Sequence, residues 1–174
     1  MLHLIGYSIM TYNHIWQGMG FLDRVPLHPL LVPIIFTWLI VNGFYWTKNY
    51  NEFMKRLIII ACIAQPFYMY YFDRMGLNIV FTYIILMIVL KALDENIIDK
   101  YILIPSVVFI GLLVNIELAW VMLPLGILFY YIRPYVINKI MFLHKIRINK
   151  SFIRIYYPGH LLILSIIKYY LLTK

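Results

Sequence analysis

Charged residues are scarce in this chain. They make up 13% of its 174 residues, whereas soluble domains carry about 25%. Hydrophobic residues make up 64%, and the mean hydropathy is +0.84. A soluble domain of this length could not bury so much apolar surface, but in a bilayer that surface faces lipid or other helices. The composition therefore predicts an integral membrane protein rather than a soluble domain.

Acidic residues and cysteines are also few. Seven Asp and Glu stand against 15 Lys and Arg, which gives a formal net charge of +8. In a membrane protein this excess is typical of cytoplasmic loops, so we expect no nucleic-acid partner. The one cysteine, Cys62, excludes an internal disulfide and a cysteine-ligated metal cluster.

Several catalytic signatures are missing. The sequence has no Gly-rich phosphate loop, no paired acidic dyad and no His-Glu-x-x-His motif. It also has no internal repeat or low-complexity linker, so we expect a single domain over residues 1–174. Metal binding by His3 and His14 would need a third ligand that the sequence does not suggest, and no metal site is expected.

Apolar runs separated by short polar breaks predict roughly seven transmembrane helices. The predicted spans cover residues 2–21, 30–46, 57–72, 77–93, 101–114, 118–132 and 155–172. Arg133-Pro134 is expected to end the sixth span, because proline disrupts a helix. The alternative for the fifth and sixth spans is one re-entrant hairpin. The predicted fold class is all-α, a polytopic transmembrane helix bundle.

The basic residues orient this bundle. With the N-terminus in the cytoplasm and an odd number of spans, most of the 15 Lys and Arg fall on the cytoplasmic side. Residues 135–150 carry several of them and either lie along the inner leaflet or form a solvated loop. We therefore predict a multi-pass protein with a cytoplasmic N-terminus.

Polar side chains within a span are costly, so each is a candidate for function. The first span places five residues on one helical face, at intervals of three and four. They are His3, Tyr7, Met10, His14 and Gln17. This stripe either lines something polar or makes hydrogen bonds to neighbouring helices.

His160 is the second candidate. It follows Pro158 and Gly159, which disturb a helix and free backbone groups beside the imidazole. The ring could act as a base, donate to a carbonyl oxygen, or lie at the start of a helix.

Three further polar residues lie inside predicted spans. Gln65 precedes Pro66, and Asn78 and Thr82 are four residues apart on one face. Interhelical hydrogen bonding is the favoured interpretation of each taken singly. Glu117 is expected to be solvated at a loop tip.

Five short strings, in order over nearly the whole chain, resemble the TraX family of membrane proteins. This family comprises the pilin acetylases of conjugative plasmids and their chromosomal relatives. The strings lie at residues 4–15 (LIGYSIMTYNHI), 33–49, 56–67, 77–82 (LNIVFT) and 157–162 (YPGHLL).

The resemblance implies an acyltransferase-like membrane fold in a bacterial inner membrane. The implied activity moves acetyl from cytoplasmic acetyl-CoA to an amine or hydroxyl acceptor, such as a pilin or another membrane or extracytoplasmic partner. His14 corresponds to the early-helix catalytic histidine and His160 to the family's other prominent histidine, with Asn13 beside the first. The matching polar positions are expected to serve acetyl-CoA binding. They are Arg56, Gln65, Asn78 and Thr82.

Two acidic residues of the family are replaced here, by Asn13 and Asn42. An Asp beside the catalytic histidine would stabilise an imidazolium, whereas Asn can only orient a tautomer. The alternative is therefore a non-catalytic protein of the same fold that acts in pilus assembly or partner binding. A carrier or channel lined by the first span, and a haem protein using two of the five histidines, are further alternatives.

Overall fold

The computed structural model describes the backbone of residues 2–18, 31–96, 99, 101–102, 105–106, 109, 113, 116–140 and 150–172. It describes side chains at residues 5–15, 31–96, 116–134 and 155–171, and at the isolated positions between 99 and 113. The named helices are α1 (Leu2–Gly18), α2 (Leu31–Trp46), α3 (Tyr50–Phe72), α4 (Ile79–Asp94), α6 (Ala119–Ile140) and α7 (Lys150–Leu172). The all-α prediction is confirmed for this part of the chain.

The predicted membrane-spanning character of the helices is not supported by the structure. Within the described ranges, no helix combines the length and the apolar character that crossing a membrane requires. The structure therefore supports the all-α class and gives no support to the polytopic arrangement.

The helix starts follow local capping chemistry. α3 begins at Tyr50 rather than at residue 57, because the Asn49 side chain accepts a hydrogen bond from the Glu52 backbone N–H and caps the helix. Asn78 caps α4 in the same way by accepting from the Val80 N–H. The predicted span at 101–114 falls largely outside the described residues.

The predicted end of the sixth span at Arg133-Pro134 is wrong. α6 continues through Pro134 to Ile140. Proline lacks the N–H that would bond the carbonyl four residues earlier, which is that of Tyr130. The Tyr45 hydroxyl donates to this Tyr130 carbonyl oxygen at 3.3 Å. A side chain of α2 thus satisfies the acceptor that Pro134 leaves open, and the helix persists.

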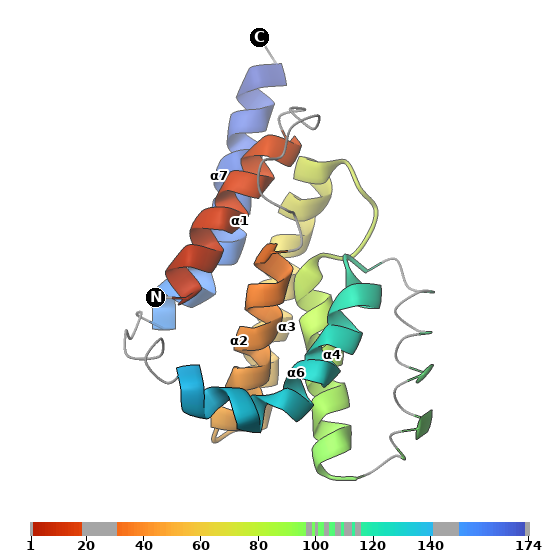
Figure 1. Ribbon diagram of the computed structural model, residues 1–174. Coiled ribbons are helices and arrows are strands. Elements are labelled where there is room, and N and C mark those ends of the chain that lie inside the picture. Colours follow the sequence, from red (N-terminus) through yellow and green to blue (C-terminus); the bar gives the residue numbers. More distant parts are fainter. Residues whose placement is uncertain are drawn as a thin grey trace.

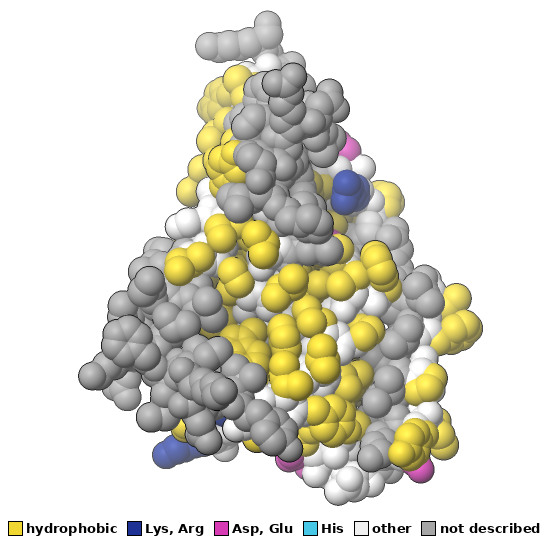
Figure 2. All heavy atoms as spheres, in the orientation of Figure 1, with side chains coloured by type: hydrophobic (Ala, Val, Ile, Leu, Met, Phe, Trp, Pro, Cys, Tyr) yellow, Lys and Arg dark blue, Asp and Glu magenta, His cyan; other side chains and the backbone are white. Residues whose placement is uncertain are grey.

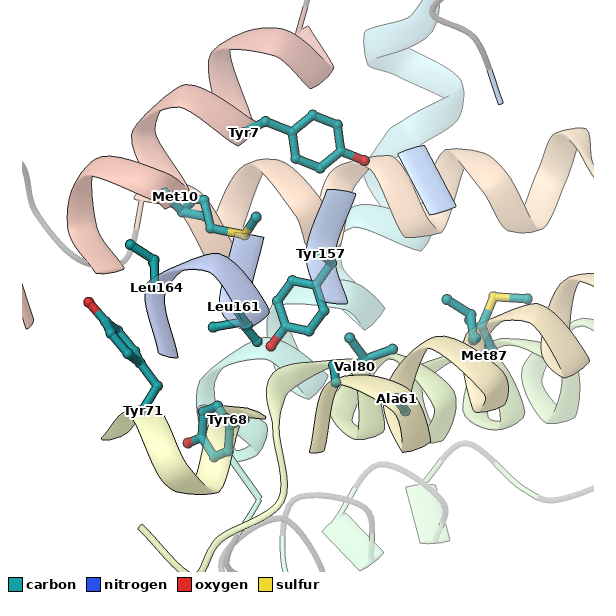
Figure 3. Close-up of a cluster of buried hydrophobic side chains, with 13 residues drawn as sticks. Tyr7, Met10, Ala61, Tyr68, Tyr71, Val80, Met87, Tyr157, Leu161 and Leu164 are labelled. Carbon is teal, nitrogen blue, oxygen red and sulfur yellow. The ribbon is translucent and has the colours of Figure 1, made fainter. Parts of the chain in front are cut away.

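Figure 1 shows α1 and α7 side by side at one end of the bundle, with α2, α3, α4 and α6 forming the rest. Direct contacts join α3 to α7 and α4, α6 to α2 and α4, and α1 to α2. One buried cluster joins residues of α1, α2, α3, α4 and α7, and Figure 3 shows most of it. A second joins α2, α4 and α6.

Gly126 allows α6 to approach α4 closely. A Cβ atom at this position would lie 2.4 Å from a methyl carbon of Leu86, well inside van der Waals contact. Leu86 is fully buried, so this contact sets the spacing of the two helices.

Large hydrophobic side chains remain exposed on the described surface. On α3 they include Ile59 and Ile63, and on α7 they include Ile163 and Ile166. Figure 2 shows hydrophobic side chains gathered across the described part of one face. Contiguous apolar patches of this kind are typical of surfaces that meet another molecule or a lipid phase.

Candidate functional site: a histidine pair

The structure brings His14 of α1 and His160 of α7 together. Nδ1 of His14 lies 2.8 Å from Nε2 of His160, which is a hydrogen-bond distance. The two rings are nearly parallel, with an angle of 20° between their planes and 5.0 Å between their centroids. Two nitrogens that share one tetrahedral metal lie farther apart, at about 3.3 Å, so the pair is hydrogen-bonded directly.

The neighbouring carbonyl fixes the tautomers of the neutral pair. Nδ1 of His160 lies 2.9 Å from the Tyr156 carbonyl oxygen, which can only accept, so this nitrogen carries the proton. Nε2 of His160 then accepts a hydrogen bond from Nδ1 of His14. The remaining nitrogen of His14, Nε2, therefore carries a lone pair. The arrangement leaves His14 as the base of the pair and His160 as the group that orients it.

Aromatic rings surround the two imidazoles. Phe72 meets His14 edge-on at 5.2 Å between centroids. Tyr156 stacks against His160 at 5.3 Å, and Tyr157 approaches it at 5.5 Å. His160 is only 8% exposed. These walls exclude solvent from the ring of His160.

Hydroxyl groups beside the pair hold α1 against α7. The hydroxyls of Tyr156 and Thr11 hydrogen-bond each other, and both lie within hydrogen-bond distance of the Tyr7 carbonyl oxygen, at 3.2 and 3.1 Å. Since each hydroxyl has a single proton, one of the two donates to the carbonyl and the other donates to its fellow hydroxyl. The rings of Tyr7 and Tyr156 lie 4.3 Å apart. These contacts fix the α1–α7 crossing that places one histidine opposite the other.

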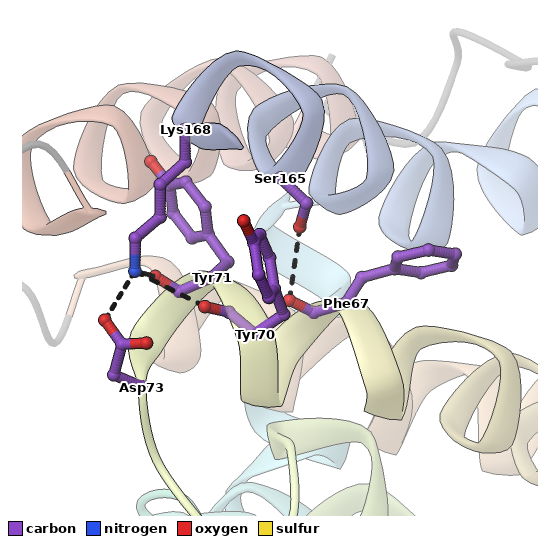
Figure 4. A network of polar contacts seen from close by, with 6 residues as sticks. All are labelled: Phe67, Tyr70, Tyr71, Asp73, Ser165 and Lys168. Carbon is purple, nitrogen blue, oxygen red and sulfur yellow. Dashed lines mark hydrogen bonds and ion pairs between the residues drawn. The ribbon is translucent and has the colours of Figure 1, made fainter. Parts of the chain in front are cut away.

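The C-terminal end of α3 contributes a further support. The Tyr71 hydroxyl donates to the His14 carbonyl oxygen at 2.8 Å. Tyr71 is itself held by Lys168 of α7, whose ammonium group donates to the Tyr71 carbonyl at 2.9 Å and pairs with Asp73 (Figure 4). In the same view Ser165 donates to the Phe67 carbonyl at 3.3 Å. α3 therefore contacts both α1 and α7 and fixes the position of each.

Asn13 precedes His14 on α1 and is 4% exposed. Among the described residues, its Oδ1 atom has no hydrogen-bond partner. Leaving such a buried acceptor unpaired costs about 1–3 kcal/mol. Asn13 is thus the one predicted catalytic residue with an unmet hydrogen-bonding requirement in the described part of the chain.

Arg56, predicted to bind acetyl-CoA, does not lie beside the histidines. Its guanidinium lies 5.8 Å from the centre of the Phe53 ring, near the start of α3. The helical rise places it about 22 Å along the axis from Tyr71, which contacts His14.

Gln65 and Asn78 bond to each other. The Asn78 amide donates to Gln65 Oε1 and to the Ala61 carbonyl, both at 2.9 Å. The Gln65 amide donates to the Gly76 carbonyl at 2.9 Å. These bonds tie the 73–78 turn to α3, as expected of interhelical hydrogen bonding.

Thr82 and Glu117 form the next contact. The Thr82 hydroxyl donates to the Glu117 carbonyl oxygen at 2.8 Å. The prediction of a solvated Glu117 is wrong, because its side chain is partly buried. Burial raises the pKa of the Glu117 carboxyl group to about 7, although Arg74, the Ile79 N–H and Tyr68 oppose this shift.

Asn42, which the resemblance matched to an acidic residue of the TraX family, is 3% exposed. Its amide nitrogen donates to the Trp38 carbonyl at 2.9 Å, and its Oδ1 accepts from Nε of Arg133 at 3.1 Å. Arg133 also lies 3.9 Å above the Tyr45 ring. The sequence did not indicate that Arg133 would reach back to α2.

Of the predicted stripe on α1, Tyr7 and Met10 are buried in the core. The side chains of His3 and Gln17, and residues His28 and His144, lie outside the described residues. The sequence indicated no role at this site for Thr11, Tyr71 or Tyr156. The sequence could have indicated one of them. Tyr156 lies four residues before His160, which places the two on the same face of a helix.

The described residues contain no group of three or more His, Cys, Asp or Glu that could hold a metal ion. A comparison with known protein families, curated proteins and solved structures finds no match to this chain.

Proposed function

We propose that this chain is a membrane-embedded acetyltransferase that moves acetyl from cytoplasmic acetyl-CoA to an amine or hydroxyl acceptor, such as a pilin N-terminus. The observation that carries the proposal is the hydrogen-bonded pair of His14 and His160. The pair comes from two of the five strings that resemble the TraX family.

The chemistry follows from the tautomers. Nε2 of His14 takes the proton of the acceptor amine or hydroxyl as that group attacks the thioester carbon of acetyl-CoA. The new acetyl bond forms, the carbon–sulfur bond breaks, and the proton is returned to the departing CoA thiolate. His160 accepts from Nδ1 of His14 and so stabilises the positive charge that develops on His14, as an orienting group does in a triad.

A location in a bacterial inner membrane, with several spans and a cytoplasmic N-terminus, belongs to the same proposal. The hydrophobic share of 64% and the bias of basic residues support it. The exposed isoleucines on α3 and α7 supply an apolar surface for lipid.

The experiment is acetylation of a candidate acceptor in cells that express the chain, read as one added acetyl group by mass spectrometry. We expect His14→Ala to reduce acetylation by roughly 10²–10⁴-fold, the usual contribution of a general base. The matched control is Ser165→Ala, which removes a different buried hydrogen bond of α7. Equal acetylation by wild type, His14→Ala and His160→Ala would remove both histidines from catalysis.

A second candidate is a non-catalytic protein of the same fold. The replacement of two family acids by Asn13 and Asn42 favours it, as do the internal partners of Gln65, Asn78 and Thr82. Acetyl-CoA binding to the purified protein distinguishes the two, because a pure assembly factor binds none.

A further inference from the structure

A pocket of about 280 Å³ lies where the ends of α2 and α4 meet the start of α3. It is smaller than the roughly 300–1,000 Å³ typical of sites for drug-sized ligands, so it suits a small group. Its lining includes Phe44, Tyr45, Tyr50, Lys91, Asp94 and Glu95. The rise of α3 separates Tyr50 from Tyr71 by about 31 Å. The pocket is therefore distinct from the histidine pair.

The pocket wall carries charged groups of both signs that have unused hydrogen-bond donors and acceptors. Nζ of Lys91 lies 3.7 Å from Glu95, and the two side chains are 40% and 49% exposed. One oxygen of Asp94 accepts from the Tyr130 hydroxyl at 3.2 Å. An ammonium group has three donors and a carboxylate about four acceptor positions. Each group can therefore bind a ligand without breaking its present contact.

The balance of charge favours a ligand that carries an ammonium group. Two carboxylates face one lysine in the lining, which disfavours a purely anionic occupant. The aromatic walls already contact cations of the chain, since Lys91 lies 4.7 Å above the Tyr50 ring and Arg133 lies above Tyr45. Lys91 in turn offers a cation for a phosphate.

Large aromatic side chains are exposed around the pocket. Trp46 is 70% exposed and Tyr131 is 45% exposed, and both belong to the helices whose residues form or adjoin the pocket. Tryptophan and tyrosine concentrate at the level of lipid headgroups. In the proposed membrane location, the pocket lies at this level.

We propose that the pocket binds the phosphoethanolamine headgroup of a zwitterionic phospholipid. The ammonium group donates to Asp94 and Glu95, and the phosphate accepts from Lys91. The inference rests on the proposed membrane location and is independent of acetyl transfer.

The test titrates the full chain, purified in detergent, with short-chain phosphatidylethanolamine and follows the thermal unfolding midpoint. We expect saturable stabilisation by this lipid and weaker stabilisation by phosphatidylglycerol, which lacks the ammonium group. Asp94→Asn, which keeps the contact to Tyr130, should weaken binding about tenfold, the loss of one charged hydrogen bond. Glu52→Gln is the matched control for Glu95→Gln, because both acids pair with a lysine on a helix surface and Glu52 does not line the pocket.

Three outcomes would overturn the inference. They are equal stabilisation by phosphatidylglycerol, unchanged binding by both Asp94→Asn and Glu95→Gln, and binding of soluble phosphoethanolamine as tight as that of the lipid. The last would assign the pocket to a free amine. Acetylation is measured in parallel. A pocket variant that loses lipid binding but keeps normal acetylation shows that the pocket acts independently of acetyl transfer. A His14→Ala variant that loses acetylation but keeps normal lipid binding shows that the histidines act independently of the pocket.

Discussion

At the scale of single residues, the neighbours of each imidazole decide what the histidine pair can do. Tyr156 contributes to the site through two different atoms. Its carbonyl oxygen sets the tautomer of His160, and its hydroxyl ties α7 to Thr11 and Tyr7. A substitution that removes only the hydroxyl separates these two contributions.

Tyr156→Phe should lower the free energy of unfolding by about 1 kcal/mol, the usual net value of a hydrogen bond. It should reduce acetylation far less than His14→Ala does, because the carbonyl that orients His160 is retained and Tyr71 still holds the His14 backbone. Thermal unfolding and acetylation of the same preparation measure the two effects. A large loss of acetylation with unchanged stability would contradict the division of roles.

The Glu117 carboxyl group should make stability depend on pH. Its pKa is raised in the folded chain, from 4.5 to about 7, so between these values the unfolded chain binds fewer protons. The free energy of unfolding therefore falls as pH rises from about 4.5 to about 7. Glu117→Gln should flatten this part of the profile, measured by denaturant unfolding across the range. An unchanged slope in the variant would assign the dependence to other groups.

At the scale of helices, the α3–α7 contact depends on a lysine held among carbonyl oxygens. The Lys168 side chain is 14% exposed and bonds two carbonyls of α3 as well as Asp73. Charged hydrogen bonds of this kind contribute more than exposed ion pairs do.

Lys168→Met should lower the free energy of unfolding by about 1.5–3 kcal/mol, because it leaves the end of α3 without its cation. Lys55→Met is the control, since the Lys55 side chain is 69% exposed in a surface ion pair and should cost at most about 1 kcal/mol. Thermal denaturation of both variants gives the comparison. Equal losses would show that the Lys168 contacts are no stronger than a surface pair.

The α4–α6 spacing gives a second prediction at this scale. Gly126→Ala should destabilise the fold by about 1–3 kcal/mol, because the added methyl overlaps Leu86. Shortening Leu86 to Val in the same chain should recover part of the loss, since the two positions are in contact. Additive losses in the double variant would contradict the proposed contact.

Local pattern located the helices more reliably than their ends. The apolar runs placed α2 and α4 closely, because these helices are hydrophobic nearly all round and are followed by polar residues. The end of α6 was missed, because the bond from Tyr45 to the Tyr130 carbonyl comes from a distant helix. The residues adjacent to Pro134 in the sequence cannot predict this bond, because Tyr45 is far from them along the chain.

At the scale of the whole molecule, the sequence indicated the two histidines and not the contacts that hold them. Helical spacing identified His14 and a proline-glycine step identified His160. Their direct bond depends on how α1 crosses α7, which Thr11, Tyr71 and Tyr156 set. Gln65, Asn78 and Thr82 make hydrogen bonds to neighbouring segments, which is the interpretation favoured for each when judged singly. The resemblance alone suggested a ligand role for them, which stays a prediction.

The proposed membrane location gives a prediction for the intact chain. After alkaline carbonate extraction of membranes from expressing cells, we expect the protein in the pellet, because its exposed isoleucines need a lipid phase. A known peripheral protein in the same sample should be released as the control. Recovery of this chain in the supernatant, folded and monomeric, would contradict the location.

The histidine pair joins two segments that are 146 positions apart, and this separation has a consequence for biosynthesis. A ribosome synthesises α1 long before α7. During most of translation His14 therefore has no His160 to bond with. Under the proposed function, an unfinished polypeptide has no assembled histidine pair and should not consume acetyl-CoA. Two co-expressed fragments, divided between α4 and α6, would regain activity only by reassociating.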